Sequence, residues 1–248
     1  MLAVHFSAHV ERTTRGFTLS QADQQTLAGG GRVNLSNGGG DRVELELVAD
    51  FPDYVSDPLP GNPQIVRGSN PFALALAGDQ LYVTDGGRNH LWQVDVPTGA
   101  VSVLATFPPI VPNPVGGFSP VLEAVPTGIT YADGALLVTL FRGAPFPAGT
   151  SSVVRVDPAT GAQPTLIGGL RTAIGVVRAR DGYYVLQHSS GPGLFFGAPG
   201  VVLRFADPSA PAQPLANCLT RPTAMWLDDS SGIVYVVEFG GRLVALGL

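Results

Sequence analysis

The sequence predicts an all-β fold built from a unit of about fifty residues that recurs along the 248-residue chain. Each copy contains four short apolar runs, and turn residues separate the runs. Equivalent residues also keep their spacing: Pro71 and Pro126 lie 55 positions apart, and so do Leu81 and Leu136. Four short strands per period is the pattern of a β-propeller blade. We therefore expect a β-propeller of four-stranded antiparallel blades.

The runs favour strands over helices. They are short, rich in Val, Tyr, Leu and Ile, and bounded by Gly, Pro, Asp or Asn. An amphipathic helix would need apolar residues three and four positions apart over ten or more residues. The sequence shows no such spacing, so no helix is expected. In chain order the runs are 70–72, 81–83, 91–95 and 101–104; 125–127, 136–138, 153–157 and 165–167; 176–177, 183–186, 201–205 and 214–215; and 221–223, 233–237 and 242–246.

Three aspartates start the tight turns between the third and fourth strands. In the turn that begins at Asp157, the aspartate supplies a side-chain hydrogen-bond acceptor, Pro158 has a fixed φ, and Gly161 is a flexible last residue. Asp95 and Asp207 occupy the same place in their copies. We predict that these aspartates are turn residues, and none is a catalytic candidate.

The N-terminal residues fit the repeat from its second strand onward. Segments 2–6, 32–35 and 43–48 are the expected second, third and fourth strands, so residues 1–51 are expected to be an incomplete first blade. Residues 1–248 then form a single propeller domain with about five visible blades. Either the N-terminal strands complete the last blade, or upstream sequence is missing. The second is favoured because the first copy lacks the innermost strand, and a full-length form is then expected to have six blades.

Composition limits the partners. The net charge is −5, and all 14 basic residues are arginines that form no cluster, which argues against nucleic acid. No stretch approaches the roughly 18 apolar residues of a membrane span. A single cysteine, Cys218, permits no internal disulfide, and the first residues do not look like a signal peptide. A monomer is expected.

Several segments are similar to those of a known family, namely 69–72, 82–87, 91–95, 105–109, 125–127 and 141–149. On these segments the chain resembles the ScyD/ScyE family, bacterial propeller proteins related to NHL-repeat, strictosidine-synthase and gluconolactonase-like propellers. The resemblance implies export, to the periplasm or the cell exterior, and a longer N-terminus than this chain shows. It supplies no catalytic motif that can be transferred residue by residue.

Loops on one face of a propeller are the usual place of its function, because the connections between second and third strands and between blades gather there. Aligning the second strands places Asp85, Leu140, His188 and Glu238 at one equivalent position, and the long connections bring Asn70 and Glu123 to the same face. Asp85, Glu123, His188 and Glu238 are therefore candidate ligands for a divalent cation, calcium or zinc. The alternative is that these are solvated polar residues at strand ends.

Two classes of function follow. The favoured one is a non-catalytic binding or scaffold module that presents its loop face to a protein, glycan or small-molecule ligand, because no complete catalytic set is visible. Its expected binding residues are Asn70, Asp85, Glu123, Phe141, Arg142 and Phe146. The alternative is a metal-dependent lactonase- or lyase-like hydrolase, in which His188 or Glu238 moves the proton.

The remaining aromatic and histidine residues receive structural interpretations. Trp92 and Trp226 sit among alternating apolar residues and are expected in the core between blades. His90 follows Asn89 in a connection and is expected to be exposed. Phe195 and Phe196 are expected to pack a long loop over the tunnel, and the alternative is that they are binding aromatics.

Overall fold

The computed structural model describes residues 16–52, 54–116, 119–191 and 197–248. The chain divides into two compact units, Met1–Asp53 and Tyr54–Leu248. The expected strand at 2–6 and the aromatic pair Phe195 and Phe196 lie outside the described residues. That residues 1–51 form an incomplete blade of one single domain stays a prediction.

The first unit contains a short helix that the sequence pattern did not predict. Helix α1 (Gln21–Ala28) begins after Ser20, whose Oγ accepts the N–H of Asp23 at 3.1 Å, while the Asp23 carboxylate accepts the N–H of Ser20 at 2.9 Å. This capping box satisfies two otherwise unpaired donors. Leu27 is its one buried residue, so the helix has no apolar periodicity that the sequence pattern could reveal. The expectation of no helix was therefore wrong.

The same unit contains an antiparallel hairpin. Strands β1 (Val33–Ser36) and β2 (Arg42–Leu45) pair with Val33 opposite Leu45. The two strands expected at 32–35 and 43–48 are thus confirmed as neighbours. The segment before them is α1, which is not part of a blade pattern.

The second unit confirms the repeated four-stranded sheets. Three sheets of four strands and one of three follow each other in chain order, and all neighbouring strands are antiparallel. A small pair precedes them, β3 (Val55–Ser56) with β4 (Val66–Arg67). The four sheets are β5 (Pro71–Ala77), β6 (Gln80–Asp85), β7 (His90–Asp95) and β8 (Ala100–Thr106); β9 (Pro126–Ala132), β10 (Ala135–Leu140), β11 (Ser151–Val156) and β12 (Thr165–Leu170); β13 (Ala173–Ala179), β14 (Gly182–Gln187), β15 (Gly200–Phe205) and β16 (Gln213–Leu219); and β17 (Pro222–Asp228), β18 (Ile233–Glu238) and β19 (Leu243–Gly247).

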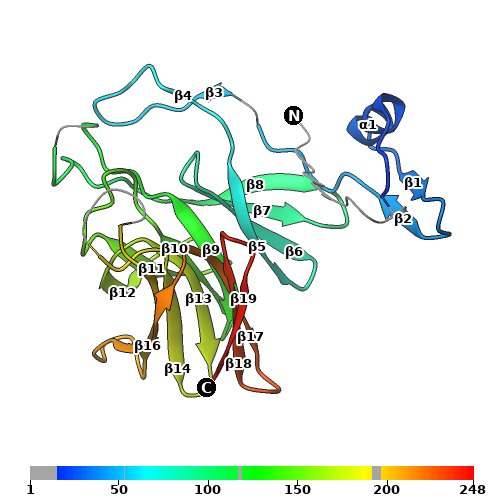
Figure 1. Ribbon diagram of the computed structural model, residues 1–248. Helices are drawn as coiled ribbons and strands as arrows, with labels where there is room; N and C mark the ends of the chain where they lie inside the picture. The colour runs from blue at the N-terminus through cyan, green and yellow to red at the C-terminus, as the bar shows by residue number, and fades with distance from the viewer. Residues whose placement is uncertain (1–15, 53, 117–118, 192–196) are drawn as a thin grey trace. The chain divides into compact units, whose positions relative to one another are not determined.

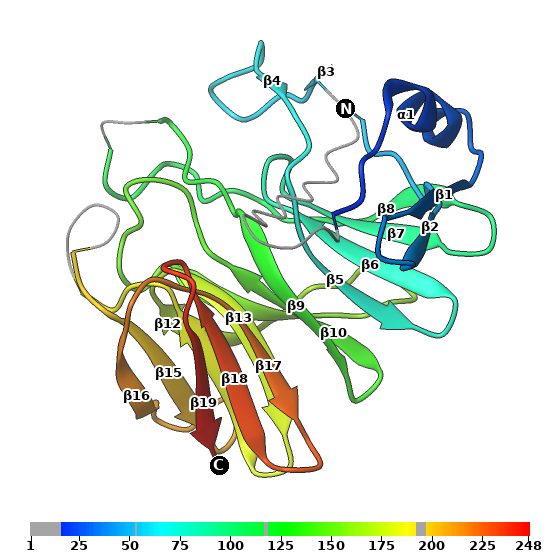
Figure 2. The ribbon, with the colours of Figure 1, turned by 45° about the vertical axis from the view of Figure 1, so that its right-hand side comes forward.

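The first strands of the four sheets lie together. Strand β5 lies beside β9, β9 beside β13, and β13 beside β17, while the later strands of each sheet lie farther out (Figures 1 and 2). A cavity of about 710 Å³ is lined by residues of all four first strands. This is the blade arrangement that the repeat predicted, with the first strands around an axial channel.

Apolar side chains fill each space between consecutive sheets. Tyr82 of β6 packs toward the second sheet, Leu137 of β10 toward the third, and Tyr184 of β14 toward the fourth. Alternate residues of the same strands face the other way, since Val138 packs toward the first sheet and Val185 toward the second. The period of two in a strand thus lets one strand serve two interfaces.

The turn aspartates are confirmed. The Asp157 Oδ1 accepts the N–H groups of Ala159 at 2.8 Å and Thr160 at 3.0 Å, and these bonds lower the pKa of Asp157. Asp207 accepts the N–H of Ser209 at 2.8 Å, and Asp95 accepts the Thr98 hydroxyl. Each carboxylate holds its own turn, as Asp residues at such positions do.

Three sequence-based interpretations are decided by burial. Trp92 is in the core, as predicted, with 5% of its surface exposed. His90 was expected to be exposed but is buried, because it begins β7 and packs edge-on against Trp92 at 5.0 Å between ring centroids. Trp226 was expected in the core but is 63% exposed, because no further sheet covers its face of β17 within the described residues.

No helix among the residues that the structure describes is long and apolar enough to cross a membrane.

Candidate functional site

Strand pairing fixes which residues end the second strands. Each of these residues pairs with the first residue of the preceding strand. The four equivalent residues are Asp85, Leu140, Gln187 and Glu238. The alignment that placed His188 in this set was one residue out of register. Tyr183 and Tyr184 are adjacent, so sequence alone did not decide which aligns with Tyr82; the buried one is Tyr184.

Asp85 is fully occupied by hydrogen-bond donors. Its Oδ1 accepts the N–H groups of Asn70 at 2.9 Å, Gly87 at 3.0 Å and Arg88 at 3.1 Å. Its Oδ2 accepts the indole N–H of Trp92 at 2.9 Å. The residue is completely buried. Asp85 therefore ties the start of β5 to the β6–β7 turn, which is a structural use of a buried carboxylate.

Gln187 and Glu238 make the same tie in their own sheets. The Gln187 Oε1 accepts the N–H of Arg171 at 2.8 Å, and the Glu238 Oε1 accepts the N–H of Thr220 at 2.6 Å. The other Glu238 oxygen binds Arg242, and these two partners lower the pKa of Glu238. In three of the four sheets the last side chain of the second strand thus binds the connection that leads into the first strand.

His188 lies one residue beyond this position. Its N–H donates to the Thr172 carbonyl, as that of Phe141 donates to the Val125 carbonyl. The imidazole Nδ1 lies 2.9 Å from the Pro222 carbonyl, which can only accept, so the tautomer with hydrogen on Nδ1 fits this contact. Burial is the main cause of a lowered pKa for His188, which favours the neutral ring.

The two predicted binding phenylalanines are buried. Phe141 and Phe146 are 8% and 7% exposed, and their rings meet edge to face at 5.6 Å between centroids. Phe141 also lies against the His188 ring at 6.1 Å. Both belong to the apolar cluster between the third and fourth sheets. Their apolar surface is buried where the long loop between β10 and β11 packs against this cluster.

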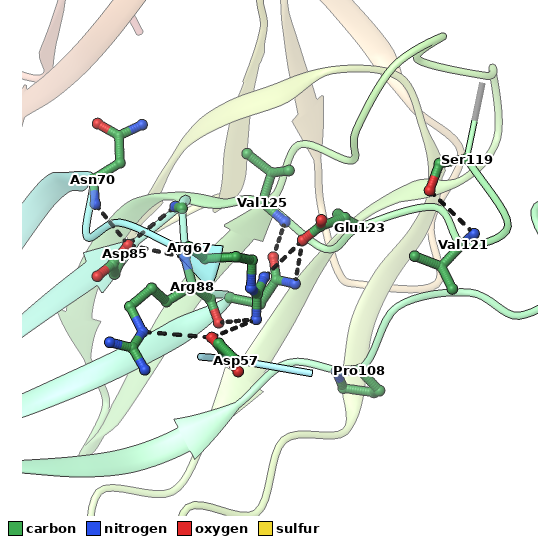
Figure 3. A network of polar contacts seen from close by, with 12 residues as sticks. Asp57, Arg67, Asn70, Asp85, Arg88, Pro108, Ser119, Val121, Glu123 and Val125 are labelled. Carbon is green, nitrogen blue, oxygen red and sulfur yellow. Dashed lines mark hydrogen bonds and ion pairs between the residues drawn. The ribbon is translucent and has the colours of Figure 1, made fainter. Parts of the chain in front are cut away.

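A buried network of ion pairs surrounds Arg67, as Figure 3 shows. Arg67 Nη1 lies 2.8 Å from Glu123 Oε2, and Arg67 Nη2 lies 2.7 Å from Asp57 Oδ2. Arg88 Nε lies 3.4 Å from the same Asp57 oxygen. The Asn89 side chain donates to Glu123 Oε2 at 2.8 Å. We call these five residues the Arg67 network; in it two guanidinium groups face two carboxylates.

The network joins three segments that are distant in the sequence. Asp57 and Arg67 come from the β3–β4 region, Arg88 and Asn89 from the β6–β7 turn, and Glu123 from the connection into β9. Asn89 has a left-handed backbone, φ 57°, and its Oδ1 also accepts the N–H of Val125 at 2.9 Å. The network therefore fastens two long connections to the first sheet.

The expected cation ligands are not brought together. Within the described parts of the chain, no three His, Cys, Asp or Glu side chains are close enough to hold a metal ion. A cation at Asp85 would have to displace four N–H donors, and one at Glu123 would compete with Arg67. The geometry gives no support to a site made of Asp85, Glu123, His188 and Glu238.

Arg142 is different from these residues because its charge is not matched. Its backbone is left-handed, φ 74°, and its Nε donates to the Thr150 carbonyl at 3.0 Å. Nη1 reaches the Pro108 carbonyl at 3.4 Å. No carboxylate among the described residues forms an ion pair with it. The side chain is half-buried, and burial lowers the pKa of the guanidinium.

Sequence reasoning missed most of the Arg67 network. Of its five members, only Glu123 was named as a candidate. Asn70 was also named; it is not a member, and its carbonyl accepts the N–H of Gly86. Arg67, Arg88 and Asp57 gave no signal, because an ion pair between residues 56 positions apart has no local pattern. Asn89 had a weak signal, since asparagine directly before a strand often takes the left-handed conformation.

Comparisons with known proteins show the fold. No protein-family model matches the chain, and neither does any curated protein. A gluconolactonase from Xanthomonas campestris has a similar structure, with a TM-score of 0.53, 18% identity, and coverage of 73% of this chain and 59% of that chain. The chain thus spans less than two thirds of that enzyme. At this identity the likeness supports the β-propeller fold alone.

Two further solved structures are more distant. Virginiamycin B lyase from Staphylococcus aureus gives a TM-score of 0.45 at 13% identity, covering 96% of this chain and 72% of that one. TolB from Acinetobacter baumannii gives a TM-score of 0.47 at 11% identity, covering 86% of this chain and 45% of that one.

Proposed function

We propose that this chain is a non-catalytic binding propeller of the ScyD/ScyE type, which is exported and holds an anionic group of its ligand at Arg142. The ligand is a protein, glycan or small molecule that carries a carboxylate, sulfate or phosphate. The surrounding binding surface is the loop face, at the ends of the second strands and the connections that follow them.

The observation that carries the proposal is the unmatched charge of Arg142. A half-buried guanidinium without a counter-ion is costly, and an anionic ligand would compensate it. A guanidinium has five N–H donors, and the carbonyls of Thr150 and Pro108 use two of them. The remaining donors suit a planar, charged acceptor such as a carboxylate.

The backbone at Arg142 supports the same interpretation. A non-glycine residue in the left-handed region costs about 1–3 kcal/mol and is kept where the surroundings impose it. Here the N–H of Arg142 donates to the Ala124 carbonyl at 3.0 Å, next to the bond from Gly143 to Glu123. These bonds fix the direction in which the side chain leaves the loop, so the guanidinium is pre-organised.

The use of the other polar residues supports a binding role over catalysis. General acid–base chemistry needs a group that can exchange a proton with the substrate. Asp85 is closed off by four N–H donors, and Glu123 is paired with Arg67. Glu238 is held by Thr220 and Arg242. These residues maintain the loops, and Arg142 is the group left for a ligand.

The proposal is tested by melting temperatures in sodium sulfate and sodium chloride at equal ionic strength. Sulfate stabilises proteins in general, so the informative quantity is the difference between Arg142→Gln and the matched variant Arg155→Gln, an exposed arginine on β11. At ten times the dissociation constant, binding adds about 1.4 kcal/mol of stability, which Arg155→Gln should keep and Arg142→Gln should lose. Equal sulfate responses in the two variants would overturn the proposal.

Export is the part of the proposal that rests on the resemblance. A protein detected in the periplasmic or extracellular fraction of its native host supports it. Recovery in the cytoplasmic fraction alone would contradict it.

A further inference from the structure

The turn between β1 and β2 consists of Asn37, three glycines and Asp41. The three glycines are exposed, and Asn37 is partly buried. A side-chain amide followed by glycine is chemically labile, because the N–H of the next residue can reach the amide carbon and glycine, which has no Cβ, hinders that approach least. A Cβ added at Gly38 would meet no atom within 4 Å, so the space around this residue is open.

Asn37 differs in this respect from the other asparagines of the chain. Some of them precede proline, which has no N–H that could react. The rest precede a residue that carries a side chain and lies in a strand. The first group is Asn62, Asn70 and Asn113, and the second is Asn34, Asn89 and Asn217.

Hydrogen bonds within the turn prepare the Asn37 amide for attack. Its Oδ1 accepts the N–H groups of Gly39 and Asp41, each at 3.0 Å. Negative charge develops on this oxygen when a nucleophile adds to Cγ, and two N–H donors stabilise that charge as in an oxyanion hole. The Nδ2 group of Asn37 donates to Asp41 Oδ2 at 3.0 Å. The N–H of Gly38, which is the nucleophile, makes no hydrogen bond within the described residues.

We propose that Asn37 is a site of self-modification, at which the nitrogen of Gly38 displaces the side-chain nitrogen and residue 37 becomes aspartate or isoaspartate. The nitrogen of Gly38 loses its proton and forms a bond to Cγ of Asn37. The Cγ–Nδ2 bond then breaks, and Nδ2 takes up a proton and leaves as ammonia. Water opens the resulting five-membered ring at Cγ, which gives aspartate, or at the backbone carbonyl, which gives isoaspartate. One water is consumed, one ammonia is released, and nothing is oxidised or reduced.

The modification acts on the β1–β2 hairpin. The aspartate product places a carboxylate where the amide donates to Asp41, and like charges repel. The isoaspartate product adds one carbon to the main chain beside the bond from the Asn37 N–H to the Asp41 carbonyl. Both products therefore loosen the connection between β1 and β2 as the protein ages, and both add negative charge to the first unit.

The test is peptide mapping by mass spectrometry after incubation of the full chain at mildly alkaline pH. In the wild type, residue 37 should gain the mass difference between an amide and a carboxylic acid, in two products that separate as aspartate and isoaspartate. Gly38→Ala should slow the reaction about tenfold, which corresponds to ~1.4 kcal/mol of activation free energy, because a Cβ hinders the approach. The backbone of Gly38 is not left-handed, so alanine fits the turn. The matched control is Gly240→Ala, at another exposed glycine with open space around it, which should react as the wild type does.

Asn113 is the internal control and should stay unmodified, since Pro114 has no N–H. A reference peptide with an unstructured Asn-Gly pair, incubated in the same tube, shows when the reaction has had time to finish. An intact Asn37 at that point would overturn the proposal, and so would equal rates in the wild type and Gly38→Ala.

Discussion

The Arg67 network and Arg142 are two arginine sites at the same end of the second unit, and they differ in what faces the charge. Arg67 is 8% exposed and contacts two carboxylates, one from the β3–β4 region and one from the connection into β9. Arg142 is half-buried and contacts two backbone carbonyls. A charge that is matched inside the protein stabilises the fold, whereas an unmatched one costs stability and is available to a ligand.

The difference separates residues that the sequence grouped together. Asn70, Asp85, Glu123 and Arg142 were all expected to bind a ligand on the loop face. In the structure the first three have partners that hold connections in place, and Arg142 alone of the four has an unmatched charge. Variants at both sites can therefore test whether fold and binding are separable in this protein.

Arg67→Met should have the largest effect. Removing the guanidinium leaves Asp57 and Glu123 without their main partner in a mostly buried place, which costs about 3–5 kcal/mol of unfolding free energy. Urea denaturation measures it. Arg204→Met is the control, because Arg204 pairs with the half-exposed Asp181 and should cost about 1 kcal/mol or less. Similar losses in the two variants would remove the distinction between matched burial and surface pairing.

Asp85→Asn should have the next largest effect. The amide nitrogen cannot accept, so at least one of the four N–H donors around Asp85 loses its bond, and the others lose a charged acceptor. We expect a loss of about 1.5–3 kcal/mol of unfolding free energy. Asp229→Asn, at an exposed turn position, should change stability by less than about 0.5 kcal/mol. An unchanged Asp85→Asn would mean that the tie to Asn70 contributes nothing.

His90 predicts a pH dependence near the network. Burial and the neighbouring Arg88 lower its pKa from 6.5 in the folded protein, although Asp57 and Asp85 act in the opposite direction. The unfolded chain therefore binds a proton more readily, so the stability from the neutral ring is present above pH 6.5 and declines as the pH falls below it. His90→Gln should show a smaller loss between pH 7 and 5 in urea titrations. A loss equal to that of the wild type would contradict this assignment.

Calcium or zinc should have the smallest effect, namely no change in melting temperature. Asp85, Glu123 and Glu238 are already occupied by N–H donors and arginines, so a cation gains no open carboxylate cluster there. Thermal melts with each ion and with chelator measure it. A rise in melting temperature that Asp85→Asn and Glu238→Gln both abolish would instead restore the metal-dependent hydrolase hypothesis.

The fold was predictable because each strand and turn has a signal in its own local sequence. Apolar runs such as 136–138 and turns such as the one begun by Asp157 repeat with the period of a sheet, and the structure places them as expected. Helix α1 was not predicted because its sequence signal is a capping box formed by Ser20 and Asp23, rather than an apolar stripe. The exposure of Trp226 was not predicted for another reason. An apolar residue suited to an interface between sheets does not reveal whether a neighbouring sheet covers it.

The site was predictable in part. The sequence alignment located the ends of the second strands to within one residue, and a shift of one residue exchanged Gln187 for His188. That the loop face binds a ligand stays a prediction. What Asp85 does was not predictable, because its donors come from Asn70, Gly87, Arg88 and Trp92, and only the folded backbone aims them at one carboxylate. The unmatched charge of Arg142 is likewise visible only in the folded chain, where no described carboxylate forms an ion pair with it.

The most direct test of the account is equilibrium dialysis with radiolabelled sulfate against the wild type, Arg142→Gln and Arg155→Gln. The account predicts about one sulfate per chain, at saturation, for the wild type and Arg155→Gln, and none for Arg142→Gln, because one guanidinium anchors one anion. Equal retention of sulfate by all three proteins, or none by the wild type, would contradict it.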